Sequence, residues 1–295
     1  MLGATLDYLI LRGLAHCRNM ATEEQLDLQL RAAAPDSFEG AKAKLRKLIE
    51  RFEGHLPVDP GLRYLDMGCG SGELTLEFAR LGGGQVTGVD VLPRRVESAT
   101  LRARQSGLAS RARFLCRDLR SWAPEERYDV LLSFDAFEHV GDPVTVLRAM
   151  SDFLAPGGSA VLAFGPLFHS PFGDHMGEFF RLQIPWRSVV FSEEAVLRVR
   201  NECFRPSDPA TGYRGIAGGL NLMRYSQFLK YVGETGWRFE YLAVNTFLRR
   251  QPALRLVSDL VLRLPGVRDY FAHNVYAVLR RAAAPTNREE LVRSA

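Results

Sequence analysis

At residues 65–72 the chain reads LDMGCGSG, a strand-like run that passes directly into a glycine-rich loop. Glycine tolerates positive φ values and lets the backbone turn tightly and approach a bound molecule closely. The helical pattern that starts near Glu73 would point free N–H groups and a partial positive charge into the same crevice. This segment therefore predicts a strand, a ligand-binding turn and a helix.

The spacing of the glycines distinguishes two classes of ligand. A dinucleotide-binding loop of the form G-x-G-x-x-G that began at Gly68 would need a third glycine where the chain has Glu73. That acid would sit where a pyrophosphate needs to be. The loop is instead G-x-G-x-G, and Asp66, just before it, offers a carboxylate to an ammonium group. A ligand with both a carboxylate and an ammonium group fits better than a dinucleotide.

Outward from this loop, short apolar runs alternate with helical stretches. Strands are expected at 64–65, 86–91, 113–116, 128–134 and 159–164, with helices from 73, from 94 and near 143. Such alternation indicates βαβ units with right-handed crossovers, and hence a doubly wound α/β fold around a parallel sheet. The carboxyl ends of the strands then lie along one edge, where ligands bind.

Acids are found at the expected ends of the next two strands. Asp90 follows Gly72 by 18 residues (90 − 72) and is placed to accept both hydroxyls of a ribose. Asp118, after the third strand, could accept an adenine amino proton, and a turn or helix cap is the alternative. The apolar side chains expected to sandwich the base are Val91, Leu92 and Leu119.

The rest of the chain divides into segments that differ in composition and hydrophobic pattern. We expect a helical N-terminal extension at 1–55, a ligand-binding core at 56–164, an aromatic-rich insertion at 165–224, completion of the core sheet at 225–282 and a frayed tail at 283–295. An insertion this long after a sheet strand is usually a lid or pocket wall. Its aromatic rings favour an apolar or aromatic ligand, unless they only pack the lid on the sheet. An apolar stripe within 254–264 is interpreted as core or as a dimer face.

Charge and composition exclude several classes of function. The formal charge of the 295 residues is only +4, and residues 246–295, with nine Arg against four acids, account for that excess. A basic stripe of the kind that binds nucleic acid is therefore not predicted. The start of the chain lacks the pattern of a secretory signal, and its longest apolar stretch, around 8–15, is too short to span a membrane. We expect a cytoplasmic protein.

Neither a disulfide framework nor a metal site is predicted. The four cysteines (Cys17, Cys69, Cys116, Cys203) lie far apart without a CxxC pair, which is typical of reduced thiols. His169 and His175 are separated by six positions in a loop that contains proline and glycine, not by the four of a helical ligand pair.

Taken together, these stretches resemble the class I S-adenosylmethionine-dependent methyltransferase family. The resemblance rests on LDMGCGSG at 65–72, GVD at 88–90, DL at 118–119, YDVLLSFDAFEHV at 128–140 and LAPGG at 154–158. It covers residues 63–165 well and the terminal strands more weakly. It implies a Rossmann-like sheet of seven strands with an antiparallel last strand, and S-adenosylmethionine as the cofactor.

The resemblance also implies roles for individual residues. The glycine loop would line the methionine part of the cofactor, Asp90 would hold the ribose, Asp118 would meet the adenine, and Phe134 and Asp135 would flank the sulfonium. The complete set of expected cofactor-binding residues is Asp66, Gly68, Cys69, Gly70, Gly72, Asp90, Val91, Leu92, Asp118, Leu119, Phe134 and Asp135.

Methyl transfer from a sulfonium needs little acid–base machinery. Alignment of the nucleophile with the methyl group can supply roughly 7–11 kcal/mol. A hydroxyl acceptor would gain from a general base, and the candidates are His139 and His175, with purely structural roles as the alternative. Substrate contacts are expected from His169, Phe172 and Trp186 in the aromatic insertion.

These expectations describe an enzyme that methylates a small molecule, in secondary metabolism or on a lipid-like compound, and the apolar stripe allows a homodimer. One alternative is a protein that binds S-adenosylmethionine without transferring its methyl group. Methylation of nucleic-acid bases is disfavoured because residues 133–136 read SFDA and lack the [DNS]-P-P-[YFW] pattern, and a nicotinamide oxidoreductase is disfavoured by Glu73. The substrate, its accepting atom and the oligomeric state stay open.

Overall fold

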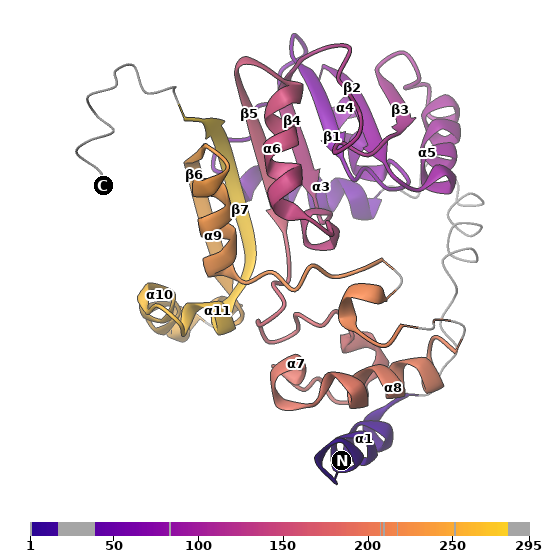
Figure 1. Cartoon of the computed structure of the whole chain (residues 1–295). Coiled ribbons are helices and arrows are strands. Elements are labelled where there is room, and N and C mark those ends of the chain that lie inside the picture. The colour runs from indigo at the N-terminus through magenta and orange to yellow at the C-terminus, as the bar shows by residue number, and fades with distance from the viewer. Residues whose placement is uncertain are drawn as a thin grey trace.

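The structure, a computed structural model, describes residues 2–16, 39–82, 84–206, 208, 210–216, 218–250 and 252–282. Its centre is a seven-stranded sheet in the order β3-β2-β1-β4-β5-β7-β6 (Figure 1). The strands are β1 (Arg63–Met67), β2 (Gln85–Asp90), β3 (Ala112–Cys116), β4 (Tyr128–Phe134), β5 (Leu154–Phe164), β6 (Trp237–Thr246) and β7 (Ala272–Arg281). The predicted α/β class and doubly wound, Rossmann-like sheet are confirmed.

The direction of the strands creates one ligand-binding edge. Strands β1 to β5 run parallel to their neighbours, whereas β7 is antiparallel to both β5 and β6. The antiparallel last strand that the family resemblance implies is therefore present. The chain runs outward from β1 to β3 and returns to place β4 on the other side of β1. In open sheets of this kind, ligands bind in a crevice where the direction reverses, which here is at the carboxyl ends of β1 and β4.

Helices cover both faces of the sheet because successive strand residues point to opposite sides. On one face, Val130 and Leu132 of β4 share a core with α3 (Glu39–Arg51), α4 (Glu73–Leu81) and α5 (Pro93–Gln105). On the other, Leu131 belongs to the core that includes α6 (Pro143–Phe153) and α9 (Tyr225–Glu234). The buried apolar stripe of each helix is what holds it on the sheet.

A third apolar cluster lies beyond the sheet and joins the two ends of the insertion to the N-terminus. Helix α1 (Leu2–Leu14) packs against α8 (Glu193–Cys203), with Leu11 and Val196 both fully buried. A β-bridge between Ala15 and Phe180 continues this contact. Figure 1 shows α1, α7 (Arg187–Val190) and α8 together at one end of the molecule.

The expected N-terminal extension at 1–55 is thus divided between two parts of the fold. Helix α1 joins the insertion, while α3 joins the sheet, because their apolar faces match different partners. The intervening residues 17–38 and the expected frayed tail at 283–295 lie outside the described residues.

Short helices complete the connections between strands. They are η2 (Phe137–His139), η3 (Gly177–Phe179), η4 (Tyr213–Gly215), η5 (Phe247–Arg250), η6 (Pro252–Leu254), α10 (Arg255–Arg263) and α11 (Arg268–Phe271). The apolar stripe within 254–264 falls on α10, where Leu262 packs on the core but Leu256 is 84% exposed. Of the two interpretations, a core role does not hold for the whole stripe, and a dimer face stays a prediction. Among the described helices, none has the length and apolar character needed to cross a bilayer.

Candidate active site

The glycine loop after β1 adopts the left-handed backbone that its sequence predicts. Gly68, Gly70 and Gly72 have φ values of 76°, 55° and 83°. A Cβ atom added at Gly68 would lie 2.4 Å from the Cβ of Ala136, and one at Gly72 would lie 2.8 Å from that of Ala99. A Cβ atom at Gly70 would meet nothing within 4 Å. Packing within the protein therefore requires the two outer glycines, and the middle one borders open space.

Asp90 faces this loop from the end of β2. Its Oδ2 accepts a hydrogen bond from the amide of Gly70 at 3.0 Å, and its Oδ1 accepts one from the amide of Leu92 at 2.9 Å. Each carboxylate oxygen keeps a lone pair for a further donor, such as a hydroxyl of a diol. The neighbouring side chains, Val91 and Leu92, are 60% and 39% exposed. The end of β2 thus offers a fixed anion beside an apolar surface.

Asp66 is engaged within the protein. The hydroxyl of Thr75, on α4, donates a hydrogen bond to its Oδ2 at 2.5 Å. Burial raises the pKa of Asp66 to about 6, although the hydrogen bond from Thr75 opposes that shift. The carboxyl group therefore ties β1 to the first turn of α4, and its predicted contact with an ammonium group stays a prediction.

Asp118 forms a local ion pair. The guanidinium of Arg120 donates to both of its carboxylate oxygens, from Nε at 3.0 Å and from Nη2 at 2.5 Å. These hydrogen bonds lower the pKa of Asp118, and the Arg120 amide donates one more at 2.9 Å. This geometry fits the turn interpretation of Asp118. Its neighbour Leu119 is buried in the core.

The thiol of Cys69 lies in the glycine loop but is buried. Burial raises its pKa well above the ordinary value, with the nearby carboxylates of Asp66 and Asp90 acting in the same direction. A thiol held in its protonated form is a poor nucleophile. Cys69 is therefore not a candidate for a reactive thiol, and its predicted contact with the cofactor stays a prediction.

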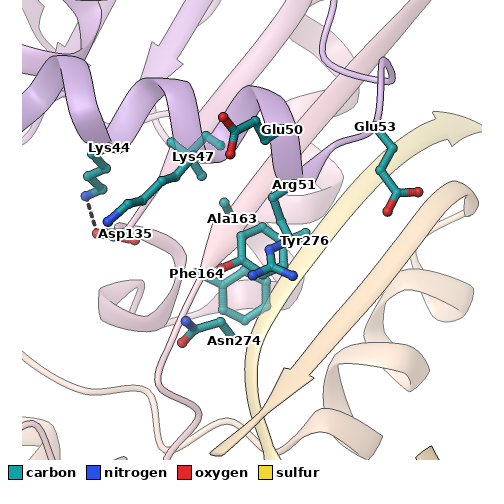
Figure 2. A pocket seen from close by; sticks show the side chains of 11 residues that line it. Lys44, Lys47, Glu50, Arg51, Glu53, Asp135, Ala163, Phe164, Asn274 and Tyr276 are labelled. Carbon is teal, nitrogen blue, oxygen red and sulfur yellow. Dashed lines mark hydrogen bonds and ion pairs between the residues drawn. The ribbon is translucent and has the colours of Figure 1, made fainter. Parts of the chain in front are cut away.

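The end of β4 connects the crevice to α3. Phe134 is buried there, whereas Asp135 is exposed and has a φ of 50°. The amide of Asp135 donates to the carbonyl of Ala163 at 2.8 Å, and its carboxylate pairs with the ammonium of Lys44. This ion pair bridges α3 and the mouth of the crevice (Figure 2).

A cavity of about 510 Å³ adjoins this ion pair. Figure 2 shows Phe164 and Tyr276 on its sheet side, with Lys47 and Arg51 reaching over it from α3. The complete lining is Lys44, Lys47, Leu48, Glu50, Arg51, Glu53, Asp135, Ala163, Phe164, Asn274 and Tyr276. Sequence reasoning missed most of these residues. The one feature of the sequence that pointed to them was the Lys- and Arg-rich run at 42–51, whose apolar side faces the sheet.

A second cavity of about 570 Å³ lies next to the first, and Arg51 and Asn274 line both. Its other lining residues are Asn245, Thr246, Arg255, Asp259 and His273. The first cavity thus has an aromatic side, and the second is lined by polar and charged side chains.

The two candidate histidines lie beside each other, with ring centroids 5.6 Å apart. The Nδ1 of His139 is 2.7 Å from the carbonyl of Gly219, and the Nε2 of His175 is 3.1 Å from that of Pro166. Because a carbonyl only accepts, these nitrogens carry the protons, which leaves Nε2 of His139 and Nδ1 of His175 as acceptors. Desolvation by the surrounding protein lowers the pKa of the His175 ring, and the neighbouring His139 acts in the same direction.

Glu138 is a titratable residue to which the sequence analysis assigns no role, although it lies in the stretch 128–140. It is only 4% exposed, and its Oε1 accepts a hydrogen bond from the amide of Gly165 at 3.3 Å. Its Oε2 has no hydrogen-bond partner among the described residues. Burial raises the pKa of Glu138 to about 8, and the negative charge of Asp135 contributes to the rise.

The three predicted substrate contacts lie against the connection between β6 and β7. The indole of Trp186 donates to the carbonyl of Tyr270 at 2.7 Å, and the ring of His169 is 5.4 Å from that of Tyr270. Phe172 packs edge-on against His273, which lines the second cavity. Phe172 therefore lies nearest a cavity, while Trp186 and His169 pack the insertion onto α11. Across the described residues, no cluster of three His, Cys, Asp or Glu side chains could hold a metal ion.

Comparison with known proteins gives matches centred on the same part of the chain. Residues 65–158 match the family described as "Methyltransferase domain". The ubiquinone biosynthesis O-methyltransferase of Cereibacter sphaeroides is 46% identical over 103 residues, which cover 35% of this chain and 40% of that protein. The 27-O-demethylrifamycin SV methyltransferase of Amycolatopsis mediterranei is 33% identical over 128 residues, covering 43% and 47%. The matched region thus spans less than half the length of these relatives.

Solved structures match over more of the chain but at low identity. Geranyl diphosphate C-methyltransferase from Streptomyces coelicolor A3(2) aligns with a TM-score of 0.52 and 16% identity, over 81% of this chain and 79% of that one. The [4+2]-cyclase SpnF aligns with a TM-score of 0.52 and 18% identity, over 82% and 81%. At this level of identity the likeness shows the fold alone.

Proposed function

We propose, on the premise that the chain belongs through residues 65–158 to the class I S-adenosylmethionine-dependent methyltransferase family, that it transfers a methyl group from this cofactor to a small molecule. The observation that carries the proposal is the geometry of Asp90, whose two carboxylate oxygens are fixed by backbone amides at the edge of the glycine loop. That arrangement suits the two hydroxyls of a ribose.

The residues of the crevice fit the cofactor. Open space beside Gly70 would admit the methionine part, and the first-turn N–H groups of α4 lack partners within the helix and would attract its carboxylate. The exposed side chains of Val91 and Leu92 offer apolar surface to the adenine. When bound, S-adenosylmethionine supplies an electrophilic methyl group on a sulfonium. The chain must then bind, orient and shield from water the two reacting molecules.

We place the acceptor in the cavity of about 510 Å³, because it opens beside Asp135 at the end of β4. Its volume is typical of a small-molecule site. An apolar or aromatic acceptor would pack on Phe164 and Tyr276, and the cations Lys47 and Arg51 would stabilise an oxygen that loses its proton. The O-methyltransferase activity named for the Cereibacter sphaeroides relative supports an oxygen acceptor.

His139 and His175 are the proposed acid–base residues. Each has one ring nitrogen that donates to a backbone carbonyl and one that is left as an acceptor. Neither ring lines the cavity of about 510 Å³, but His175 donates to the carbonyl of Pro166, two residues after the lining residue Phe164, so the acceptor hydroxyl would have to reach from the cavity toward this turn. General base catalysis of this kind contributes roughly 10²–10⁴-fold. The insertion at 165–224, together with α1, is the proposed lid that excludes water, and Phe172 is its proposed substrate contact.

We also propose that the protein acts in the cytoplasm and has no nucleic-acid partner. Within the described part of the chain, Cys69 and Cys116 are free thiols, which suits a reducing compartment. The exposed cations at the acceptor cavity are accompanied by acids such as Glu50 and Asp135. A surface of mixed charge does not favour a polyanion.

The proposal is tested with S-adenosylmethionine labelled in its methyl group and a cell metabolite extract. We expect label to appear in a small compound, and we expect calorimetry to show binding of S-adenosylhomocysteine. Label found only in RNA or protein would contradict the substrate class. Tight binding of S-adenosylhomocysteine without any labelled product would favour the alternative, in which the cofactor is bound but not used for methylation.

A further inference from the structure

Helix α10 carries an apolar face that the described part of the chain leaves uncovered. Leu256 is 84% exposed, Val257 46% and Leu260 60%, and Leu264, the residue after the helix, is 44% exposed. Large apolar side chains gathered on one face are uncommon on a surface that meets only water. Figure 1 places α10 and α11 at the edge of the molecule, beyond β6 and β7.

The opposite side of α10 fixes its orientation. Ser258 is fully buried, and its hydroxyl is hydrogen-bonded to that of Thr246, at the end of β6, at 2.6 Å. Leu262 packs against the main core. Because each residue of a helix advances by 100°, the row formed by Leu256 and Leu260 then points away from the protein. The fold thus presents the apolar face on a rigid base.

The apolar surface continues into the turn that follows. Val267 is 41% exposed and Tyr270, on α11, is 38% exposed. A tyrosine ring has an apolar body and a polar tip, which suits the boundary between a membrane and water.

The exposed charges on this face are of one sign. Arg255 and Arg263, at the two ends of α10, are both exposed. Of the two acids between residues 253 and 271, Asp259 is partly buried and lines the second cavity. The other, Asp269, is buried and accepts hydrogen bonds from the backbone and hydroxyl of Ser226. The exposed charges of this segment are therefore cations.

We propose that α10 and the turn after it dock the protein on an anionic lipid bilayer, with the helix lying in the plane of the interface and not crossing it. An amphipathic helix with a leucine-rich face and flanking arginines has the composition of such interfacial helices. Anionic headgroups would pair with Arg255 and Arg263 while the leucines enter the acyl boundary.

A second copy of the chain fits this surface less well. In a two-fold dimer the same patch meets itself, so the arginines of one copy would approach those of the other. Between residues 253 and 271 the structure shows no exposed acid to pair with them. An anionic bilayer supplies the missing charge.

The position of α10 has a consequence that rests on the proposed function. Arg255 and Asp259 line the second cavity, which shares the lining residues Arg51 and Asn274 with the proposed acceptor cavity. A bilayer held against the outer face of α10 would lie next to this opening. The arrangement suits an amphiphilic acceptor that passes from the lipid surface into the protein.

The test is sedimentation of the full chain with vesicles of phosphatidylcholine, with and without about a quarter of phosphatidylglycerol. We expect binding to the anionic vesicles that weakens as salt is added. The variant Leu256→Glu/Leu260→Glu should bind at least about tenfold more weakly, because it places charge where apolar area is buried. Arg255→Gln/Arg263→Gln should lose about fivefold for each arginine removed. The matched control is Leu101→Glu, a change at a leucine of α5 that is 42% exposed.

Four outcomes would overturn the proposal: no binding of the native chain, equal binding of the α10 leucine variant, equal loss in the Leu101→Glu control, or self-association that the leucine variant abolishes. Sedimentation velocity without lipid measures the last of these. Thermal unfolding should be the same for all variants, since the changed side chains are exposed. The assay needs neither S-adenosylmethionine nor an acceptor, so its failure is independent of any failure of the proposed function.

Discussion

The side chain of Glu138 accepts a hydrogen bond from the backbone amide of Gly165 at 3.3 Å, which ties the turn after β4 to the turn after β5. The rest of the carboxyl group is enclosed, and burial raises its pKa to about 8. At neutral pH the group is therefore mostly protonated. A neutral carboxylic acid can hold the two turns together without adding a second negative charge next to Asp135.

This relationship predicts how stability changes with pH. Glu138 has an ordinary pKa of 4.5 and a raised pKa of about 8 in the folded chain, so the folded state binds more protons between these values. The free energy of unfolding should therefore fall as the pH rises through this window, by on the order of 1.4 kcal/mol for each unit of pKa difference. The variant Glu138→Gln removes the proton and should have a flatter profile. Urea unfolding at several pH values measures both, and parallel profiles would contradict the assignment.

A second prediction concerns the proposed ribose contact. Asp90→Asn replaces one acceptor oxygen with an NH₂ group, which only donates. The side chain can then no longer accept hydrogen bonds from both backbone amides, and it binds the two ribose hydroxyls less well. We expect the affinity for S-adenosylhomocysteine to fall roughly 10–10²-fold, the effect of losing one hydrogen bond to a charged group at about 1.5–3 kcal/mol. Calorimetry gives the dissociation constants. The control is Asp152→Asn, at an exposed position of α6, which should leave the affinity unchanged.

A third prediction concerns the insertion. Arg187 and Asp174 form a buried ion pair, with side chains 0% and 2% exposed and a distance of 2.7 Å from Nε to Oδ2. Arg187→Met leaves the carboxylate of Asp174 buried and unpaired, which should destabilise the protein by about 3–5 kcal/mol. Adding Asp174→Leu should recover part of that loss.

Helix α8 supplies a matched control for this prediction. Arg198 pairs with Glu202 at 2.8 Å, but the two side chains are 58% and 39% exposed. Arg198→Met should therefore cost less than about 1 kcal/mol. Urea unfolding compares the variants. Equal losses for Arg187→Met and Arg198→Met would show that burial of the first pair does not govern its contribution.

Much of the fold could be predicted because its signals are local. The strand, the loop and the helix around Gly70 follow from adjacent residues, and an apolar run such as 128–134 forms a strand in any parallel sheet of this kind. The number of strands and the antiparallel direction of the last one came from the family resemblance and not from the residues alone. The positions of Asp90 and of the glycines needed only their spacing along the chain.

The parts that escaped prediction depend on contacts between distant segments. Nothing near Leu11 indicates that it packs against a helix that begins at Glu193. The buried state of Glu138 arises only when β5 ends beside it. Trp186 is of a residue type that often contacts ligands, but its indole N–H donates a hydrogen bond to the carbonyl of Tyr270. Sequence patterns do not specify such long-range partners.

A final prediction separates the two histidines. The Nε2 of His175 donates to the carbonyl of Pro166, and burial lowers the pKa of the ring below its ordinary 6.5, so Nδ1 stays available as a base in mildly acid solution. We expect the acid limb of the kcat profile to lie below pH 6.5 and to disappear in His175→Gln, with kcat reduced roughly 10²–10⁴-fold. His139→Gln keeps a donor for Gly219 and should cost less.

The profile is measured with the acceptor identified by methyl labelling, and both variants should bind S-adenosylhomocysteine like the native chain because neither ring lies in the glycine loop. The reverse pattern, with the larger loss in His139→Gln, would make His139 the base and His175 its neighbour. Equal and small losses would contradict a histidine base altogether. In that case the rate would have to come from alignment of the acceptor against Phe164 and Tyr276, next to the cations of α3. The variant Arg51→Met should then raise KM for the acceptor without affecting cofactor binding.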